Sequence, residues 1–232
     1  MFKKLFFTLV ICLFIKTNAQ DGTVSPYSYF GLGTFNPANT VENNAMGGLS
    51  IYGDSIHVNL QNPASYGLLK LTTYTVGVSH RRMALTSDTQ EKSTALTAID
   101  YLSVAMPIAE NIGIGFGITP VTSMGYILNS SAENANGETI TNVFSGDGGL
   151  SKIYFSLGAA PIKNFTVGAS AFANFGTVNK ERVQSLSSVL FGTIDRRTSR
   201  MNGFNFQMAA NYTPNITDKL TLYTSFVHTT GL

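Results

Sequence analysis

The sequence predicts an all-β protein, a transmembrane antiparallel up-and-down β-barrel. Three observations support this fold class. Apolar residues alternate with small polar ones through most of the chain after residue 70, short turns alternate with long polar segments, and charges are nearly absent from the alternating stretches. Two-residue alternation is typical of strands that separate two environments. Outer-membrane barrels combine such strands, each of about 9–11 residues, with short turns at one end and long loops at the other.

The first 19 residues predict a secretory signal peptide. Lys3 and Lys4 precede the apolar run Leu5–Ile15, and Ala19 ends a short stretch of small residues before Gln20. This is the layout of an export signal, and the run is shorter than the ~20 residues that span a bilayer. The only cysteine lies in this run, so the exported chain has no disulfide and no cysteine-based site.

Charge and composition exclude several classes of function. Removing Lys3, Lys4 and Lys16 from the 15 basic residues leaves 12 against 13 acidic residues, so the exported chain carries no basic excess for nucleic acid. Charged residues make up 12% of the chain, about half the usual share of a soluble domain. No apolar run after residue 19 is long enough for a membrane helix.

Residues 20–69 predict an N-terminal segment that folds into the barrel lumen as a hatch, or plug. The segment is rich in glycine and asparagine, contains Pro26, Pro37 and Pro63, and shows no sustained alternation. Asn39 is a candidate cap for a short helix through Val41–Met46, which the glycine pair at 47 and 48 would end.

Residues 70–232 predict seven strands of about ten residues each. In the stretch 112–118, IGIGFGI, bulky apolar residues alternate with glycine. We expect the bulky side chains to face lipid, and the glycines to make room for the backbone of the hatch. The seven alternating stretches cover residues 73–79, 101–106, 112–118, 153–158, 165–171 and 204–211, with the last beginning at 220–222.

The connections alternate in length. Pro107, Pro161 and Pro214 each open a short turn, and they are 54 and 53 residues apart. Long polar loops are predicted between these hairpins, and they carry most of the charge. The loops cover roughly residues 83–98, 123–150 and 177–202.

A soluble β-sandwich also has alternating strands, with charges on its water-facing side. Here the charges lie only near the predicted strand ends, at Asp100, Lys152 and Lys219, which favours a barrel with its bulky face toward lipid. Bacterial single-chain barrels have even strand counts, and an unclosed sheet leaves unpaired backbone groups in lipid. Seven strands therefore predict the N-terminal part of a longer barrel, or a sheet that pairs with another chain.

Several motifs resemble the start of the FadL/OmpP1/TodX family of outer-membrane transport barrels. They are the stretch AMGG at 45–48, Asp54, and NLQNPA at 59–64, which ends just before the first predicted strand. The resemblance covers about residues 40–175 and includes the glycine-alternating third strand that Pro120 interrupts. The head SPYSYFGLG at 25–33 departs from the family pattern.

The resemblance implies a barrel of about fourteen strands with an N-terminal hatch, of which this chain would be the first half. It implies passive uptake of hydrophobic small molecules, such as long-chain fatty acids, across the outer membrane of a Gram-negative cell. Asn62, Pro63 and Ala64 would form the hatch motif, and Pro120 would mark a kink in the third strand. Pro120 could instead mark the upper end of that strand.

The sequence predicts no enzyme, no cofactor and no metal site. His57, His80 and His228 lie near predicted strand ends without a nucleophile motif, and no metal-ligand spacing is present. The expected partners are outer-membrane lipid and a hydrophobic small molecule whose binding residues the sequence does not identify. The alternative prediction is a structural or accessory outer-membrane barrel whose loops bind a protein partner, for example in protein secretion.

Overall fold

The computed structural model describes residues 25–86 and 91–231. The predicted signal peptide, residues 1–19, lies outside the described residues. Among these residues no helix is long and apolar enough to cross a membrane. The elements in chain order are η1 (Pro26–Tyr29), β1 (Thr34–Phe35), α2 (Val41–Ala45), η2 (Pro63–Leu68), β2 (Thr73–Thr86), β3 (Glu91–Ala109), β4 (Ile112–Glu133), β5 (Thr139–Ile162), β6 (Phe165–Leu186), β7 (Thr193–Tyr212), β8 (Asn215–Thr217), β9 (Leu220–Thr221) and β10 (Thr224–Thr229).

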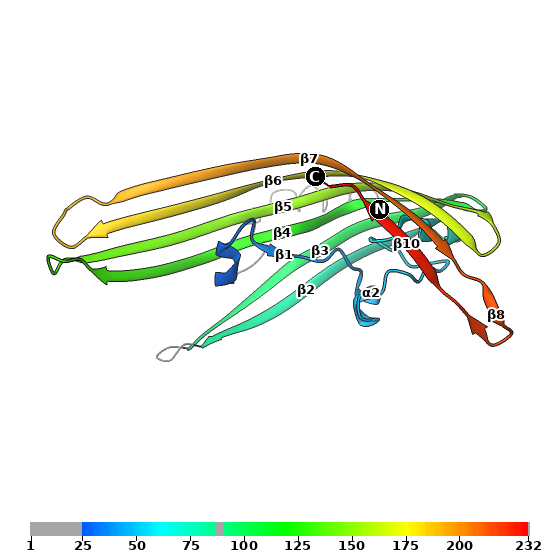
Figure 1. Ribbon diagram of the computed structural model, residues 1–232, viewed down its shortest axis with the longest axis horizontal. Helices are drawn as coiled ribbons and strands as arrows, with labels where there is room; N and C mark the ends of the chain where they lie inside the picture. The colour runs from blue at the N-terminus through cyan, green and yellow to red at the C-terminus, as the bar shows by residue number, and fades with distance from the viewer. Residues whose placement is uncertain (1–24, 87–90, 232) are drawn as a thin grey trace, which may run out of the picture.

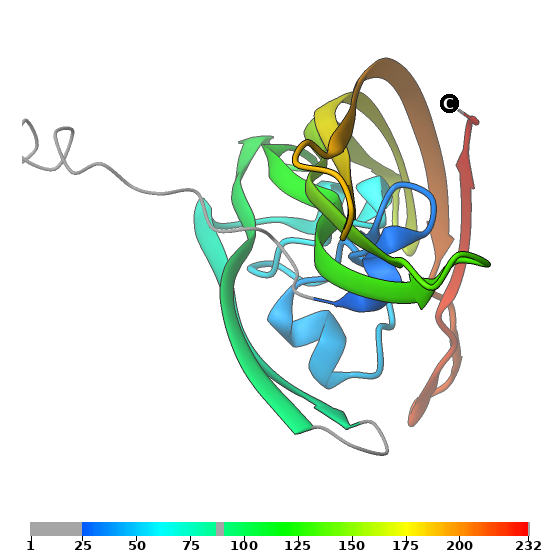
Figure 2. The same ribbon diagram turned by 90° about the vertical axis from the view of Figure 1, so that its left-hand side faces the viewer.

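Seven strands follow one another in a curled antiparallel sheet in the order β10-β7-β6-β5-β4-β3-β2, and the short strand β1 pairs with β4 off this path (Figures 1 and 2). Each strand lies beside its neighbour in this sheet, so the predicted up-and-down antiparallel arrangement is confirmed. The sheet curls like half of a barrel, with β2 and β10 at its two edges. A closed barrel of about fourteen strands therefore stays a prediction.

Four of the strands are about twice as long as the sequence predicts, whereas β10 has only six residues. β4, β5, β6 and β7 contain 22, 24, 22 and 20 residues. The predicted long loops 83–98, 123–150 and 177–202 are wrong, because most of these residues continue the ladders as hairpin extensions. The extensions carry mostly polar side chains on their outward face, so the regular apolar alternation that marks a half-buried strand is lost while the pairing continues.

The last strand also differs from the prediction. Leu220 and Thr221 form β9, which pairs with β8 in a separate two-stranded sheet at the short-turn end. The seventh strand of the main sheet is β10, which pairs with β7 from Thr224 to Thr229. The turn Asp218-Lys219 between β8 and β9 accounts for the difference, because it closes a small hairpin first.

Two charged residues placed near strand ends by the sequence lie within strands instead. Asp100 is a bulge residue of β3, skipped where the pairing with β2 shifts, and its Oδ1 accepts a hydrogen bond of 2.9 Å from Ser79 Oγ. Lys152 lies within β5, where its Nζ is 4.7 Å from the centre of the Phe172 ring.

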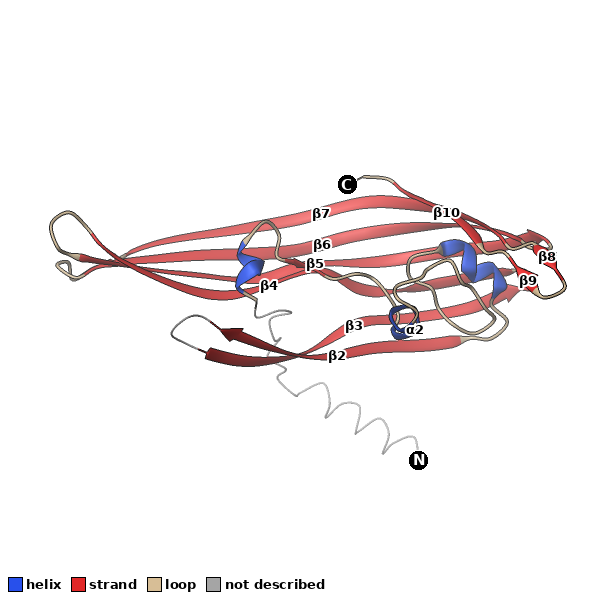
Figure 3. Cartoon of the chain, turned by 60° about the horizontal axis from the view of Figure 1, so that its bottom comes forward, coloured by secondary structure: helices blue, strands red, loops and turns tan. Residues whose placement is uncertain are grey.

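The N-terminal segment, residues 25–72, packs against the concave face of the sheet (Figures 2 and 3). The short helix α2 confirms the helix predicted at 41–46, but its cap is Thr40, whose side chain accepts from the Asn43 N–H, and not Asn39. Gly47 and Gly48 end this helix with positive φ angles, as the sequence predicts. The sheet is open, so closure of a barrel lumen by this segment stays a prediction.

Candidate functional site

The motif Asn62-Pro63-Ala64 begins the helix η2 and is fully covered. The Asn62 side chain caps η2 by accepting from the Ala64 N–H at 3.1 Å. Its Nδ2 donates to Asn211 Oδ1 at 2.9 Å and to Ser225 Oγ at 3.0 Å. One asparagine thus starts the helix and ties it to β7 and to the edge strand β10.

Several glycines on the inner face of the sheet lie directly against η2. A Cβ atom on Gly168 would overlap with the backbone of Pro63 and Ala64, and one on Gly113 would overlap with the carbonyl oxygen of Tyr66. A Cβ atom on Gly115 would overlap with the Tyr66 ring. The expectation that the glycines of IGIGFGI make room for the backbone of the N-terminal segment is therefore confirmed at position 113. Gly115 instead makes room for the Tyr66 side chain of that segment, and the expectation is wrong at Gly117, which lies against Leu102, Ser103 and Tyr154 of the sheet.

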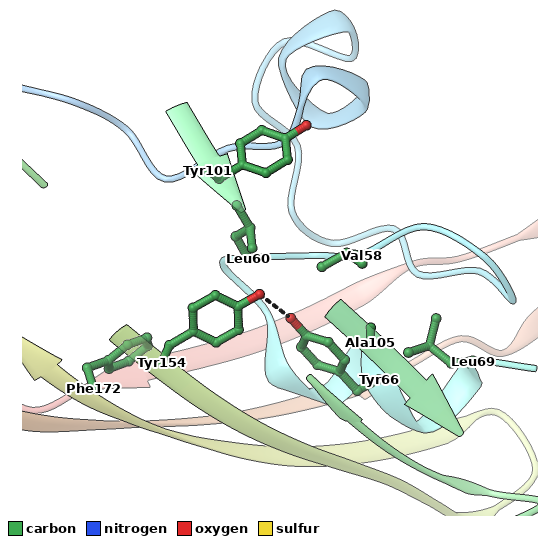
Figure 4. Close-up of a cluster of buried hydrophobic side chains, with 8 residues drawn as sticks. All are labelled: Val58, Leu60, Tyr66, Leu69, Tyr101, Ala105, Tyr154 and Phe172. Carbon is green, nitrogen blue, oxygen red and sulfur yellow. Dashed lines mark hydrogen bonds between the residues drawn. The ribbon is translucent and has the colours of Figure 1, made fainter. Parts of the chain in front are cut away.

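Hydroxyl groups and aromatic rings form the rest of this contact (Figure 4). The hydroxyls of Tyr66 and Tyr154 are 3.5 Å apart, and the Tyr154 hydroxyl is also hydrogen-bonded to Ser103 Oγ. Ser156 Oγ and Ser170 Oγ are 2.6 Å apart. Satisfied buried hydroxyls fix the position of η2 more specifically than apolar packing alone, since an unpaired buried hydroxyl is costly.

Pro120 lies within β4 and not at its end, because the strand continues to Glu133. The pairing of β4 with β5 shifts between Pro120 and Thr122, so a β-bulge follows the proline. The bulge reverses which positions face inward: Gly113 and Gly115 face inward before it, and Met124 faces inward after it. The predicted role of Pro120 as a kink residue stays a prediction, whereas its interpretation as the strand end is wrong.

The three histidines lie in separate places. His57 Nδ1 is 2.5 Å from Asp54 Oδ2, His80 contacts Thr97 Oγ1 at 2.9 Å, and His228 is in the outer edge strand β10. The hydrogen bond to Asp54 raises the pKa of His57. Burial opposes ionisation of Asp54, but hydrogen bonds from His57 and Ile56 outweigh it and lower the pKa of that carboxyl.

This pair fixes a turn of the N-terminal segment, because Asp54 Oδ1 also accepts from two backbone N–H groups. Within residues 25–86 and 91–231, no group of three or more histidine, cysteine, aspartate or glutamate residues could hold a metal ion.

The outward face of the sheet carries apolar residues in rows that run across neighbouring strands. One row crosses six strands without a polar side chain other than the Tyr74 hydroxyl, and the next row has the same character. Most of these side chains are exposed to the surroundings. The first row is Tyr74, Val104, Phe116, Phe155, Ala171 and Phe206, and the second is Val76, Leu102, Ile118, Ile153, Ala173 and Phe204.

Beyond this apolar band most outward rows are polar while the strands continue, although one further row, Val143, Val183 and Ile194, is apolar. Asp147, Asn179 and Thr198 form one polar row, and Ser145, Glu181 and Arg196 form another. β6 continues from Phe175 to Leu186, which is about 35 Å of strand at ~3.3 Å per residue. The hairpins β4–β5 and β6–β7 therefore project far past the band (Figure 1).

The tip of the β6–β7 hairpin is apolar and exposed. Val189, Leu190 and Phe191 are 54%, 94% and 84% exposed. Hydrogen bonds between Ser187 and Thr139, in both directions, hold the base of this tip against β5. Three large apolar side chains on a braced turn in a polar region form a contact surface without a partner in the described chain.

A curled antiparallel sheet with an outward apolar band, an inner face packed by its own N-terminal segment and projecting polar hairpins defines a class, the β-barrel-related proteins of the outer membrane. A family model described as BamG matches residues 1–232, so the chain belongs to the BamG family. Neither the curated proteins nor the solved structures include one that matches this chain.

The family match corrects two predictions. The resemblance to the FadL/OmpP1/TodX family is wrong, because the whole chain matches the BamG model instead. Passive uptake of hydrophobic small molecules rested on that resemblance and is wrong with it. The motif that suggested it, Asn62-Pro63-Ala64, starts a capped 3-10 helix, and asparagine followed by proline is a common start for such a turn in unrelated proteins.

Proposed function

We propose that this chain is an accessory protein of the outer-membrane Bam assembly complex in a Gram-negative cell. It holds itself in the outer membrane by the apolar band and binds a protein partner through its projecting hairpins. It performs no catalysis and carries no cofactor. Membership of the BamG family supports the complex, and it also favours the accessory role over transport.

The proposal rests on the change from apolar to mostly polar side chains along the outward face of the strands. The paired rows are apolar over a stretch that matches the ~25 Å outer band of membrane barrels, and most of the rows beyond it are polar. A sheet that served only to span the membrane would not need hairpin extensions of this length. Structured extensions outside the band offer rigid surfaces to a partner, since most of their backbone groups are already paired.

The braced tip Val189–Phe191 is the strongest candidate contact with that partner. Large apolar and aromatic side chains that are exposed at a rigid site are typical binding hot spots, each worth about 2 kcal/mol or more when truncated. In the β6–β7 hairpin itself, the two acidic residues form ion pairs, Glu181 with Arg196 and Asp195 with Arg197. Lys180, Arg182 and Arg200 add further positive charge, so the β6–β7 hairpin carries a net positive charge, which suits a partner surface with an acidic border.

The double substitution Leu190→Asp with Phe191→Asp is expected to reduce co-purification with the outer-membrane assembly complex by more than about tenfold. The full-length protein would carry an affinity tag in its native cell, and the recovered assembly-complex subunits would be quantified. The matched control is Ile216→Asp with Leu220→Asp, two exposed apolar residues of the β8–β9 hairpin at the opposite end.

The control pair is expected to leave recovery unchanged, and both variants should remain in the outer-membrane fraction. Wild-type recovery with the tip variant would show that the tip is not the contact. Absence of assembly subunits with the unaltered protein would overturn the proposed function itself.

A further inference from the structure

β3 and β4 are paired over only part of their length. The ladder between them runs from Ala109 and Ile112 to Leu102 and Ile118, and it ends there. β3 continues back to Glu91 along β2, while β4 continues to Glu133 along β5. Figure 1 shows the β2–β3 hairpin diverging from β4 in this region. One edge of β4 is thus open inside the sheet.

The N-terminal segment fills the first part of this edge by β-type pairing. Asn36 N–H donates to the Val121 carbonyl at 2.8 Å, and β1 pairs with β4 at Ser123. Ser28 Oγ then contacts both backbone groups of Gly125, each at 3.2 Å. The edge therefore accepts extended chain, and the protein itself supplies the first piece.

Among the residues that the structure describes, none pairs in this way with the second part of the edge, Ile127–Glu133. Backbone groups of Val121 and Gly125 point to this side, so those of residues 127, 129, 131 and 133 do as well, because the period of a strand is two. No backbone group within residues 25–86 and 91–231 hydrogen-bonds to these groups from that side. An open edge of this length is a template for another strand.

The space beside the open edge is large enough for an extended chain. A cavity of about 430 Å³ lies there, with Leu85 and Thr94 on the side of β2 and β3, and Tyr126, Ile127 and Leu128 on the side of β4. Asn129, Ser131 and Glu133 are exposed and lie above the apolar rows. The edge thus lies in the polar part of the sheet, where water and a soluble segment of a partner have access.

We propose that the β4 edge Ile127–Glu133 binds an extended segment of a partner polypeptide by antiparallel β-addition. The added strand lies along the β4 edge directly beyond the part that residues 28–36 cover, and main-chain hydrogen bonds provide the recognition. The partner is a protein rather than a lipid or small molecule, since only a polypeptide matches alternating N–H and C=O groups along seven residues. The inference rests on the proposed function only in taking the partner to be a protein.

The test uses the full chain with Asn129→Cys in a Cys12→Ser background, purified in detergent. The probe is a synthetic peptide of about nine residues that alternates threonine and valine around one central cysteine. A second peptide is identical except that all its backbone N–H groups are methylated, which blocks pairing on both of its edges. Disulfide formation with the first peptide is expected to exceed that with the second by about tenfold.

The matched control is Thr177→Cys, an exposed position on β6 that is paired on both sides, with Gly149 and Arg200. It is expected to react slowly and equally with the two peptides. Equal yields of the two peptides with the Asn129→Cys variant, or a disulfide-linked dimer of the chain that excludes the peptide, would overturn the proposal. Neither result affects recovery of the assembly complex, so the two proposals fail separately.

Discussion

Replacing Gly168 with valine is expected to destabilise the protein by about 3 kcal/mol or more, one of the largest effects of any single substitution in the sheet. The added Cβ would overlap with the backbone of Pro63 and Ala64, and no flexible side chain can move aside there. The N-terminal segment must then lift off the inner face or distort. Thermal unfolding in detergent, followed by circular dichroism, measures the loss.

Ala169→Val is the matched control, because Ala169 is the neighbouring residue and its side chain lies on the outward face. This control is expected to unfold within a few degrees of the unaltered protein, as surface substitutions usually do. If Gly168→Val unfolded at the same temperature as Ala169→Val, Pro63 would not lie against Gly168.

Asn62→Ala is expected to cost about 2–4 kcal/mol of folding stability. The substitution removes the cap of η2 and leaves Asn211 and Ser225 without their partner in a fully covered place. Denaturant unfolding in detergent measures the difference. Asn44→Ala, at an exposed asparagine of the same segment, is the control and is expected to change stability by less than about 0.5 kcal/mol.

A double-mutant cycle sharpens this prediction. Asn62→Ala and Asn211→Ala together are expected to cost less than the sum of the two single variants, because both remove the same 2.9 Å hydrogen bond. Strictly additive losses would contradict the contact between η2 and β7.

The alternation of apolar and small residues predicted the strands near the apolar band, because two environments impose a period of two there. The role of Gly113 followed from the same pattern, since glycine inside a strand usually marks a close approach of another backbone or a bulge. The hairpin extensions were missed. Gly146, Gly148 and Gly149 argue against a strand locally, yet pairing with β4 and β6 overrides this propensity.

The candidate contact surfaces outside the apolar band could not be predicted from the sequence either, because they depend on contacts between residues far apart in the chain. The glycine at position 146 accommodates the ring of Tyr126, a contact between residues 20 positions apart that no local pattern encodes. The open edge of β4 depends on where β3 stops pairing with it. The bulge after Pro120 reverses which side chains of β4 point inward, and no hydrophobic pattern marks this change. Pro120, which interrupts the alternating pattern, was the one sequence feature that indicated this bulge.

The most direct test of the account is the depth of three positions in the membrane of intact cells. Single cysteines would replace Leu190 at the projecting tip, Ala171 in the apolar band and Asn164 in the β5–β6 turn. A membrane-impermeant maleimide is expected to label position 190 at once, position 164 only after the outer membrane is permeabilised, and position 171 not at all. Labelling of all three positions at similar rates in intact cells would contradict a sheet that crosses the outer membrane with its long hairpins outside.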